Sequence, residues 1–305
     1  MAGMLVDSGH KVVVFDNLST GVKPWVPKGA AFVKGELLNN AHCHKVFRAY
    51  PVSAVIHFAG RIVVPESIAE PVLYYRNNVG GTLNLLAAMK EAGVRRFVFS
   101  STAAVYAPAD KGFLKETSET RPQSPYGASK FMVEKILADQ AMAGHIEFMA
   151  LRYFNVAGWD TRRAWPVKGR PVPTHLISNI MRVLHTGGEL VVCGNDYNTP
   201  DGTGIRDFIH VLDLCRAHLL SLKAMDRGIK NHIFNLGNEH GFSVMDIVKS
   251  IQKVASRSVA YRIGPRRPGD VATIVASSAR ARKILGWKPR YDLKTILKSE
   301  WERKF

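Results

Sequence analysis

The chain has 305 residues, of which 46% are hydrophobic and 22% are charged. This balance is typical of a globular protein and excludes a chain that is disordered throughout. Lysine and arginine outnumber aspartate and glutamate by 42 to 25, and the resulting net charge of +17 favours anionic ligands without indicating a fold. No apolar run approaches the length of about 18 residues that a membrane span needs. The odd count of cysteines, which lie far apart, excludes a disulfide framework and favours the cytoplasm.

Short β-branched or aromatic runs alternate with helical patterns through the first half of the chain. Buried parallel strands are expected at 11–15, 54–60, 95–101 and 148–154. Helices are expected at 77–93, where Val79, Leu83, Leu86 and Met89 share one face, and at 127–144, where Met132, Ile136 and Met142 do. This alternation predicts an α/β fold with a doubly wound parallel sheet of the Rossmann type.

Asp16 ends the first expected strand. In dinucleotide-binding folds an acidic residue at this kind of position hydrogen-bonds the adenosine ribose and repels a 2′-phosphate. No arginine follows in the segment 16–21, so NAD fits better than NADP. A lone aspartate after a strand is more often an ordinary turn residue, so this signal is weak by itself.

The second half of the chain has a different pattern. After Gly158 the sequence contains Pro- and Gly-rich loops and short helical patterns near 175–187, 211–227 and 243–256, with one more at the end. We therefore expect an NAD-binding Rossmann-type domain over 1–157. The remainder, 158–305, is expected to be mainly a smaller, mixed α/β substrate-binding lobe, with some segments returning to the first domain.

A candidate catalytic group follows the third expected strand. Tyr126 and Lys130 stand four residues apart at a helix start, which places both side chains on one face. A phenol is a poor base near neutral pH, but a nearby cation such as Lys130 favours the phenolate and lowers its pKa. Thr102 lies just past the strand, where doubly wound sheets bind their ligands. The Y-x-x-x-K spacing alone is frequent by chance, but the preceding Ser-Ser-Thr favours a catalytic group.

These segments resemble the extended short-chain dehydrogenases/reductases and, within them, the UDP-glucose 4-epimerase family. The similarity extends over nearly the whole chain and includes GHKVVVFDNLSTG, VIHFAG, FVFSSTAAVY, SPYGASKFMVE, LRYFNVAG, NDYNTPDGTGIRDFIHVLDL and GPRRPGD. The segments RYFNVAG and TPDGTGIRDFIHV are specific to this branch, whereas Y-x-x-x-K marks only the superfamily.

The resemblance implies three groups of site residues and no metal. The catalytic residues would be Thr102, Tyr126 and Lys130. The cofactor would be bound by Asp16, Asn17, Glu36, Leu37, Phe58, Ala59, Gly60, Asn77, Ser100, Tyr126, Lys130 and Tyr153. The substrate would be bound by Thr102, Asn155, His175, Arg206, Arg267, Asp270 and Ile274.

The implied activity is that of an isomerase that interconverts UDP-glucose and UDP-galactose. The sugar would be oxidised transiently at C4 with tightly bound NAD, the 4-keto intermediate would turn, and the hydride would return to the opposite face. The resemblance also implies a homodimer formed through the helices at 77–93 and 127–144. It places the enzyme in the cytoplasm and in carbohydrate metabolism such as galactose use, with UDP-sugars as partners and without nucleic acid or membrane.

The sequence departs from the family pattern at several positions. Glu36 stands where the family usually has aspartate, Cys193 replaces an aromatic residue found in some members, and the segment 162–173 is unusually basic and Pro-rich. A related nucleotide-sugar 4,6-dehydratase would carry Asp-Glu directly after Thr102, where this sequence has Ala103 and Ala104. That pair favours the epimerase over the dehydratase.

The N-terminus suggests a further alternative. Residues 1–10 resemble the end of a helix, so we expect the first strand of the fold and its glycine-rich turn to be absent. That strand would lie between those at 11–15 and 54–60. Without it the chain is expected to fold poorly and to bind NAD weakly. A catalytically impaired homologue that acts at most as a binding protein is therefore the alternative to an active epimerase.

Overall fold

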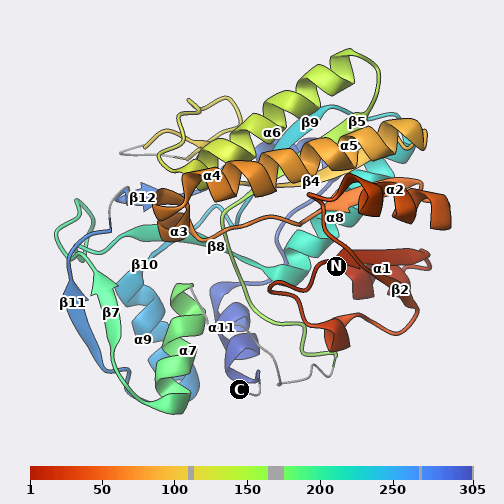
Figure 1. Ribbon diagram of the computed structural model, residues 1–305. Coiled ribbons are helices and arrows are strands. Elements are labelled where there is room, and N and C mark those ends of the chain that lie inside the picture. The colour runs from red at the N-terminus through yellow and green to blue at the C-terminus, as the bar shows by residue number, and fades with distance from the viewer. Residues whose placement is uncertain (109–112, 164–174, 268–269, 304–305) are drawn as a thin grey trace. The chain divides into compact units, whose positions relative to one another are not determined.

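The computed structural model describes residues 1–108, 113–163, 175–267 and 270–303. The chain divides into two compact units, each assembled from segments that are distant in sequence (Figure 1). The first unit comprises Met1–Val105, Thr120–Arg152 and His218–Phe234, and the second comprises Tyr106–Glu119, Tyr153–Ala217 and Asn235–Phe305. Within the described ranges no helix combines the length and apolar character that crossing a membrane requires.

Strands of the first unit form two separate sheets. One is the parallel pair of β1 (Val12–Asp16) and β2 (Ala30–Lys34). The other has the order β3 (Ala54–His57), β4 (Arg96–Thr102), β5 (Glu147–Tyr153) and β9 (His232–Leu236), with β3 and β4 parallel. The predicted α/β fold of the Rossmann type is confirmed, while β2 is a strand that the sequence pattern did not reveal.

Helices α5 (Gly81–Glu91) and α6 (Pro125–Met142) build the core of this unit against β4. Their Leu86, Met89, Val133 and Leu137 join one buried apolar cluster with Phe97 and Phe99. The other helical segments of the unit are α1 (Ala2–Asp7), η1 (Lys23–Trp25), α2 (Asn40–Ala49), α3 (Val64–Ala69), α4 (Pro71–Tyr74), the π-helix η2 (Tyr75–Gly80) and η3 (Ala103–Val105). The single helix expected at 77–93 therefore begins as a π-helix.

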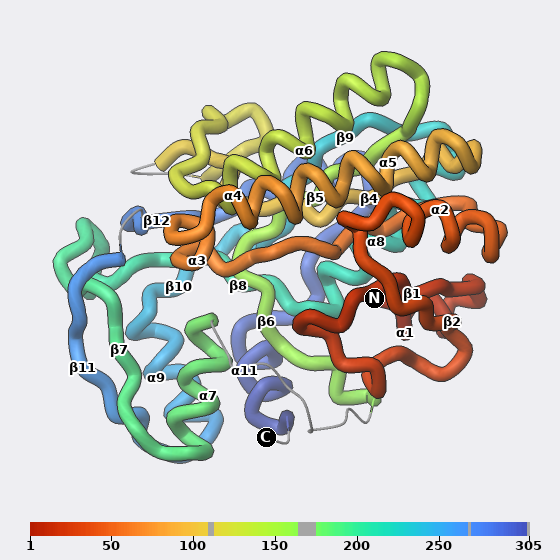
Figure 2. The backbone as a smooth tube through the Cα atoms, in the orientation of Figure 1, coloured from red at the N-terminus to blue at the C-terminus, as the bar shows by residue number. Residues whose placement is uncertain are grey.

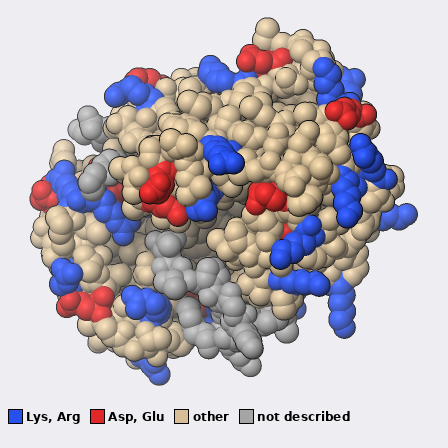
Figure 3. Space-filling view, in the orientation of Figure 1, with Lys and Arg blue, Asp and Glu red and all other residues tan. Residues whose placement is uncertain are grey.

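Several apolar residues of these helices lie on the surface rather than in the core. Leu83 is 48% exposed, Met132 is 46% exposed and Met142 is 86% exposed. The apolar faces predicted for the two helices were therefore only partly correct, because Val133 and Leu137 form the inward face of α6 in place of Met132 and Met142. Figure 3 shows a largely uncharged surface over α4 and α5, with basic and acidic side chains interspersed elsewhere on this face.

Strands β1 and β3 each have one open edge. Among the described residues, β1 pairs only with β2, and β3 pairs only with β4. All five residues of β1 are partly exposed, which corrects the prediction of a buried strand, because a strand becomes fully buried only when its edges and both faces are covered. Figure 2 shows β1 and β2 in red as a separate pair of strands. Among the described residues no strand pairs with both β1 and β3, so these two strands lie in separate sheets.

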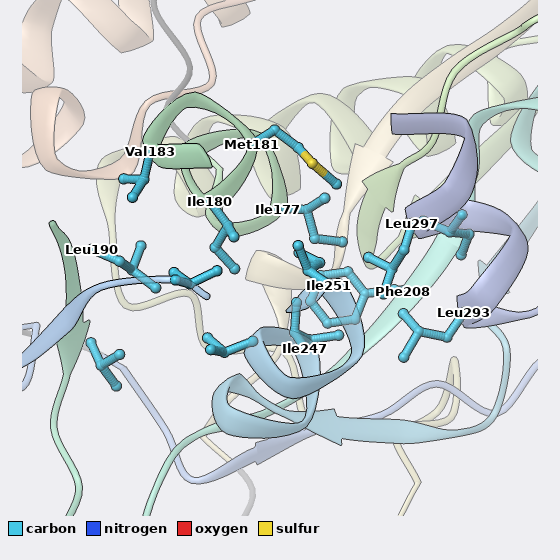
Figure 4. Packing of buried hydrophobic residues seen from close by; sticks show 14 residues of the cluster. Ile177, Ile180, Met181, Val183, Leu190, Phe208, Ile247, Ile251, Leu293 and Leu297 are labelled. Carbon is cyan, nitrogen blue, oxygen red and sulfur yellow. The ribbon is translucent and has the colours of Figure 1, made fainter. Parts of the chain in front are cut away.

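The second unit has its own core. Helices α7 (Leu176–Thr186), α9 (Val244–Ala255) and α11 (Leu293–Trp301) point apolar side chains toward one another, among them Ile177, Ile180, Ile247, Ile251 and Leu297 (Figure 4). Around them lie β6 (Asn155–Ala157), β7 (Leu190–Cys193), β8 (Ile205–His210), β10 (Gly241–Ser243), β11 (Tyr261–Gly264), β12 (Thr273–Ile274) and α10 (Ala279–Leu285). Strand β8 pairs with β6, β10 and β12, and β7 pairs with β11. Helix α8 (Val211–Asp226) contains residues of both units.

Supplying a strand for the two open edges is expected to stabilise the first unit. Extending the chain ahead of Met1 by an apolar strand of about five residues and a glycine-containing turn should bury side chains worth about 1.5–3 kcal/mol each, before the ordering entropy is subtracted. The thermal unfolding midpoint should then rise by several degrees, because about 1 kcal/mol corresponds to about 2–4 °C at this domain size. A Gly/Ser extension of equal length is the control. Equal midpoints for the two extensions would contradict the prediction.

Candidate active site

The start of α6 is held against the end of β4 by local sequence features. Ser124 accepts a hydrogen bond from the Gly127 N–H, and Pro125 occupies the first turn, so the helix begins where Pro and a capping serine favour it. Gly127 is required because a Cβ at this position would lie 2.3 Å from the carbonyl oxygen of Ala104. The segment Ser-Pro-Tyr-Gly thus brings the first turn of α6 onto the backbone that follows β4.

Tyr126 and Thr102 meet at this junction. Thr102 ends β4, and its hydroxyl accepts a hydrogen bond from the Ala104 N–H at 3.1 Å. Desolvation raises the pKa of Tyr126 above its ordinary value, and the Thr102 side chain opposes this rise. The pair therefore needs a further positive charge before the phenolate forms near neutral pH.

Lys130 stands one helical turn further along α6. Its Nζ donates to the Ser100 carbonyl at 3.0 Å and lies 4.9 Å from the centre of the Phe99 ring. Burial lowers the pKa of Lys130 to about 8, so the ammonium form still predominates at pH 7. His57, whose Nε2 lies 2.9 Å from Thr82 Oγ1, has a pKa lowered to about 3 by burial and by the charge of Lys130, and its imidazole is neutral.

Gly60 follows β3 and passes close to Lys130. A Cβ on Gly60 would lie 3.2 Å from Lys130 Nζ and 3.2 Å from Asn78 Oδ1, so glycine gives the backbone of this loop its close approach. Asn78 accepts from the Arg61 N–H and donates to Ser129 Oγ, and Ser129 in turn donates to the Tyr126 carbonyl. This buried amide was missed in the sequence.

Asn78 follows another asparagine directly in the sequence. The resemblance implies that Asn77 contacts the cofactor, and in the structure Asn77 Nδ2 donates to Asn78 Oδ1 at 2.9 Å. The π-helix decides which of the two asparagine side chains points inward, because its wider turn changes the direction of every following side chain. The spacing of apolar residues does not reveal such a turn.

The residues expected at the adenosine end of the cofactor gather at the ends of β1 and β2. Asp16 Oδ1 accepts from the Leu18 N–H at 2.6 Å, and Asn17 Nδ2 donates to Glu36 Oε2 at 2.8 Å. Leu37 follows Glu36, and its carbonyl accepts from Asn84 Nδ2 at 2.9 Å. Phe58 and Ala59, which precede Gly60, are exposed beyond the end of β3. Polar groups thus follow the ends of neighbouring parallel strands, the usual ligand-binding edge of such sheets.

The residues expected to bind substrate lie in the second unit, around β8. Arg206 Nη1 donates to the carbonyls of Ile205 and Val271, and its Nη2 lies 3.6 Å from Asp270 Oδ1. Ile274 stands directly beside Arg206 in the register of β12 and β8. Asn155 in β6 donates to the Asp207 carbonyl at 3.1 Å. Burial lowers the pKa of Arg206 and the charge of Asp270 opposes this, so the guanidinium stays charged in a partly enclosed position.

Two further substrate candidates interact electrostatically. His175 precedes α7, and its pKa is lowered by desolvation and then by the charge of Arg267. Tyr153 ends β5 and belongs to the second unit.

Of the basic segment 162–173, only Arg162 and Arg163 are described, and both pair with Asp160. The rest of that segment lies outside the described residues.

The predicted site residues therefore form two groups. Thr102, Tyr126, Lys130, Ser100, Gly60 and the residues at the ends of β1 to β3 belong to the first unit, whereas Tyr153, Asn155, His175, Arg206, Arg267, Asp270 and Ile274 belong to the second. Their roles in catalysis and binding stay predictions. A parallel sheet flanked by helices, with a tyrosine and a lysine four residues apart beside the end of a strand, defines the short-chain dehydrogenase/reductase class.

Comparison with known proteins identifies the family within that class. The chain belongs to the NAD dependent epimerase/dehydratase family, whose model matches residues 1–237. It is similar to the UDP-glucose 4-epimerase of Lacticaseibacillus casei, with 42% identity over 299 residues that cover 97% of this chain and 90% of the relative. The resemblance predicted from the sequence is thereby confirmed.

Solved structures of UDP-glucose 4-epimerases show the same similarity. The enzyme from Brucella ovis in complex with NAD is 40% identical with a TM-score of 0.92, and the match covers 98% of this chain and 92% of that one. The enzyme from Bifidobacterium longum in complex with NAD+ and UDP is 34% identical with a TM-score of 0.90, again covering 98% and 92% of the two chains. At these identities the likeness extends beyond the fold alone.

The buried lysine provides a direct test of the site's electrostatics. Lys130 is expected to lose its proton as the pH rises through about 8, because burial penalises its charged form. Nuclear magnetic resonance of chains labelled at the lysine side-chain nitrogen would follow this titration, and Lys130→Met would assign the signal by its disappearance. A midpoint near 10.4, the value of lysine in water, would contradict the buried position of this side chain.

Proposed function

We propose that this chain interconverts UDP-glucose and UDP-galactose with NAD as its resident cofactor. The observation that carries the proposal is the group at the end of β4, in which Tyr126 interacts with the Thr102 side chain and stands one helical turn from the buried, charged Lys130. The family membership and the similarity to UDP-glucose 4-epimerases support the same activity. A phenol beside a cation and a hydroxyl is suited to moving a proton to and from a sugar hydroxyl.

The residues of the first unit fit NAD. Asp16 and Asn17 would hold the adenosine ribose, with Glu36 and Leu37 beside the adenine. Gly60, at which a side chain would collide with Lys130 and Asn78, gives the loop after β3 a bare backbone for close approach to the cofactor. Lys130 Nζ, which already donates to the Ser100 carbonyl, has two further protons with which to bind a ribose hydroxyl. When bound, NAD supplies reversible acceptance of a hydride from C4 of the sugar.

The chain's own residues would move the proton. Tyr126, as the phenolate, removes the proton from the 4-hydroxyl, and Thr102 holds the sugar oxygen or relays its proton. The positive charge of Lys130 lowers the free energy of the phenolate relative to the phenol. When the hydride returns to the opposite face of the 4-keto sugar, Tyr126 gives the proton back, so the reaction has no net redox change.

The second unit would hold the nucleotide part of the substrate. Arg206 presents a planar guanidinium suited to phosphate oxygens, and Arg267 adds a second positive charge near His175. Asn155 and Asp270 would complete the contacts, and Ile274 beside Arg206 would limit the space for the sugar. Binding energy from the diphosphate holds the 4-keto intermediate while the reacting ring turns.

The segment after Thr102 favours the epimerase over a 4,6-dehydratase. Ala103, Ala104 and Val105 form the short 3₁₀-helix η3, and none of them carries a group that transfers protons. A dehydratase must protonate a leaving hydroxyl and remove a second proton from the sugar, which requires an acid and a base. In place of such a pair this chain has two methyl groups.

Replacing the proposed base should abolish most of the activity. Tyr126→Phe removes the phenolic hydroxyl and keeps the ring, so kcat for UDP-galactose epimerisation should fall by a factor of roughly 10²–10⁴. NAD content and the thermal unfolding midpoint should be unchanged, because the ring still packs. Tyr106→Phe, which removes the other hydroxyl that follows β4 and donates to Asn235 Oδ1, is the control for loss of a structural phenol. Activity of Tyr126→Phe within threefold of the parent would exclude Tyr126 from the mechanism.

The chain is further proposed to act as a homodimer in the cytoplasm. The support for a cytoplasmic place is that all three cysteines are free thiols. The support for a dimer is the uncharged surface of the first unit, to which α3, α4, α5 and α6 contribute the exposed Ile68, Val72, Leu83 and Met132. Large exposed apolar patches rimmed by polar residues mark interfaces more often than free surface.

A charge placed in that surface should dissociate the dimer. Leu83→Glu combined with Met132→Glu should halve the mass measured by sedimentation equilibrium, because two buried carboxylates would have no counter-charge. Val191→Glu is the control, since Val191 is an exposed apolar residue of β7 in the second unit. A parent chain that is monomeric at micromolar concentration would refute the homodimer.

A further inference from the structure

Helix α6 presents a row of three polar side chains to β4. Tyr126, Lys130 and Glu134 recur every four residues, so they lie on one face of the helix. Each contacts a different one of three consecutive residues at the end of β4. Tyr126 interacts with the Thr102 side chain, which lowers its pKa, Lys130 donates to the Ser100 carbonyl, and Glu134 accepts from Ser101 Oγ at 2.5 Å.

The third of these contacts belongs to a buried ion pair. Arg152 on β5 donates from Nε to Glu134 Oε1 at 2.9 Å and from Nη2 to Glu134 Oε2 at 2.5 Å. The side chains are 3% and 2% exposed, respectively. A guanidinium and a carboxylate joined by two hydrogen bonds have one relative orientation, which an apolar contact does not impose. Glu134 therefore joins α6, β4 and β5 at one point.

We propose that Glu134 is a positioning residue for catalysis, which with Arg152 and Ser101 fixes the register of α6 on β4. This inference rests on the proposed function, because the register sets where Tyr126 and Lys130 stand relative to Thr102. A shift of α6 along β4 would move all three side chains of the row together. Displacement of a catalytic group by about 1 Å costs as much as about 10²-fold in rate.

The burial of the pair favours a positional role over a stabilising one. Removing two charges from water costs free energy that their attraction often fails to recover, and apolar replacements of similar volume are frequently neutral or stabilising. Val133 and Leu137, on the same helix, belong to the apolar cluster of this unit. Stability alone therefore does not require an ion pair at this position.

The test separates the two roles by replacing the whole pair. Glu134→Leu combined with Arg152→Met leaves no unpaired charge and should keep the thermal unfolding midpoint within a few degrees of the parent. Its kcat for UDP-galactose should nonetheless fall by about 10–100-fold with KM little changed, and the acid limb of the pH–rate profile should move to higher pH. Ser101→Ala should lower kcat by a smaller factor, and Ser101→Thr, which keeps the hydroxyl, should recover it. The control for loss of a carboxylate is Glu147→Gln, which breaks the ion pair between Glu147 on β5 and the exposed Lys230.

A second readout does not depend on turnover. In the Glu134→Leu/Arg152→Met chain the titration midpoint of Lys130, followed by magnetic resonance, should rise from about 8 as a looser α6 admits water to its Nζ. A stable double variant with the parent's kcat, pH profile and Lys130 midpoint would overturn the positional role. An inactive parent chain would refute the proposed function instead, and the Lys130 midpoint would still decide whether Glu134 fixes the helix.

Discussion

The proposed catalytic group depends on the contact between the first turns of α6 and the last residues of β4. Gly127 lets the helix approach the Ala104 carbonyl closely, and Lys130 reaches back to the carbonyl of Ser100. Because both contacts involve backbone carbonyls, one in β4 and one just after it, the helix is positioned by groups that are present whatever the side chains of this segment are. The chemistry of Tyr126 follows from this position.

The contact between α6 and the strands beneath it contains two buried cations, Lys130 and Arg152. His57 is neutral, and Glu134 is neutralised by Arg152, so the charge of Lys130 is not cancelled by its immediate neighbours. Burial makes this charge costly, as the lowered pKa of Lys130 shows. Burial raises the pKa of Tyr126, so a phenolate at this position depends on a positive charge nearby, the role that we propose for Lys130.

Much of the fold could be predicted from local sequence patterns. Strands β3, β4 and β5 begin or end within a few residues of the expected positions, because β-branched and aromatic runs bounded by turn residues are a local signal. The grouping of Thr102, Tyr126 and Lys130 could be predicted because the residues lie in two short motifs at the end of a strand and the start of a helix. Strand β2 was missed because its segment, Ala-Ala-Phe-Val-Lys, is short and flanked by irregular chain.

Other features required the tertiary structure. The side of α6 that faces inward is decided by packing against β4, so Met132 is exposed although it fits an apolar helical pattern. The pairing of Glu134 with Arg152 joins residues that are 18 positions apart and lie on different elements, and no spacing rule connects them. Asn78 points inward because of the π-helix Tyr75–Gly80, whose turn contains one residue more than an α-helical turn.

That turn, Tyr75–Gly80, has a consequence for how this segment tolerates change in length. A π-turn contains one residue more than the α-turns on either side, so the segment between α4 and α5 has a residue that regular helical packing does not need. Deleting one residue there would restore an unbroken α-helix and rotate everything before it by roughly 100°. A one-residue deletion ahead of Asn78 would carry Arg61 away from Asn78 Oδ1, which accepts a hydrogen bond from the Arg61 N–H. Variation in the length of this segment is therefore limited more strictly than variation in its side chains.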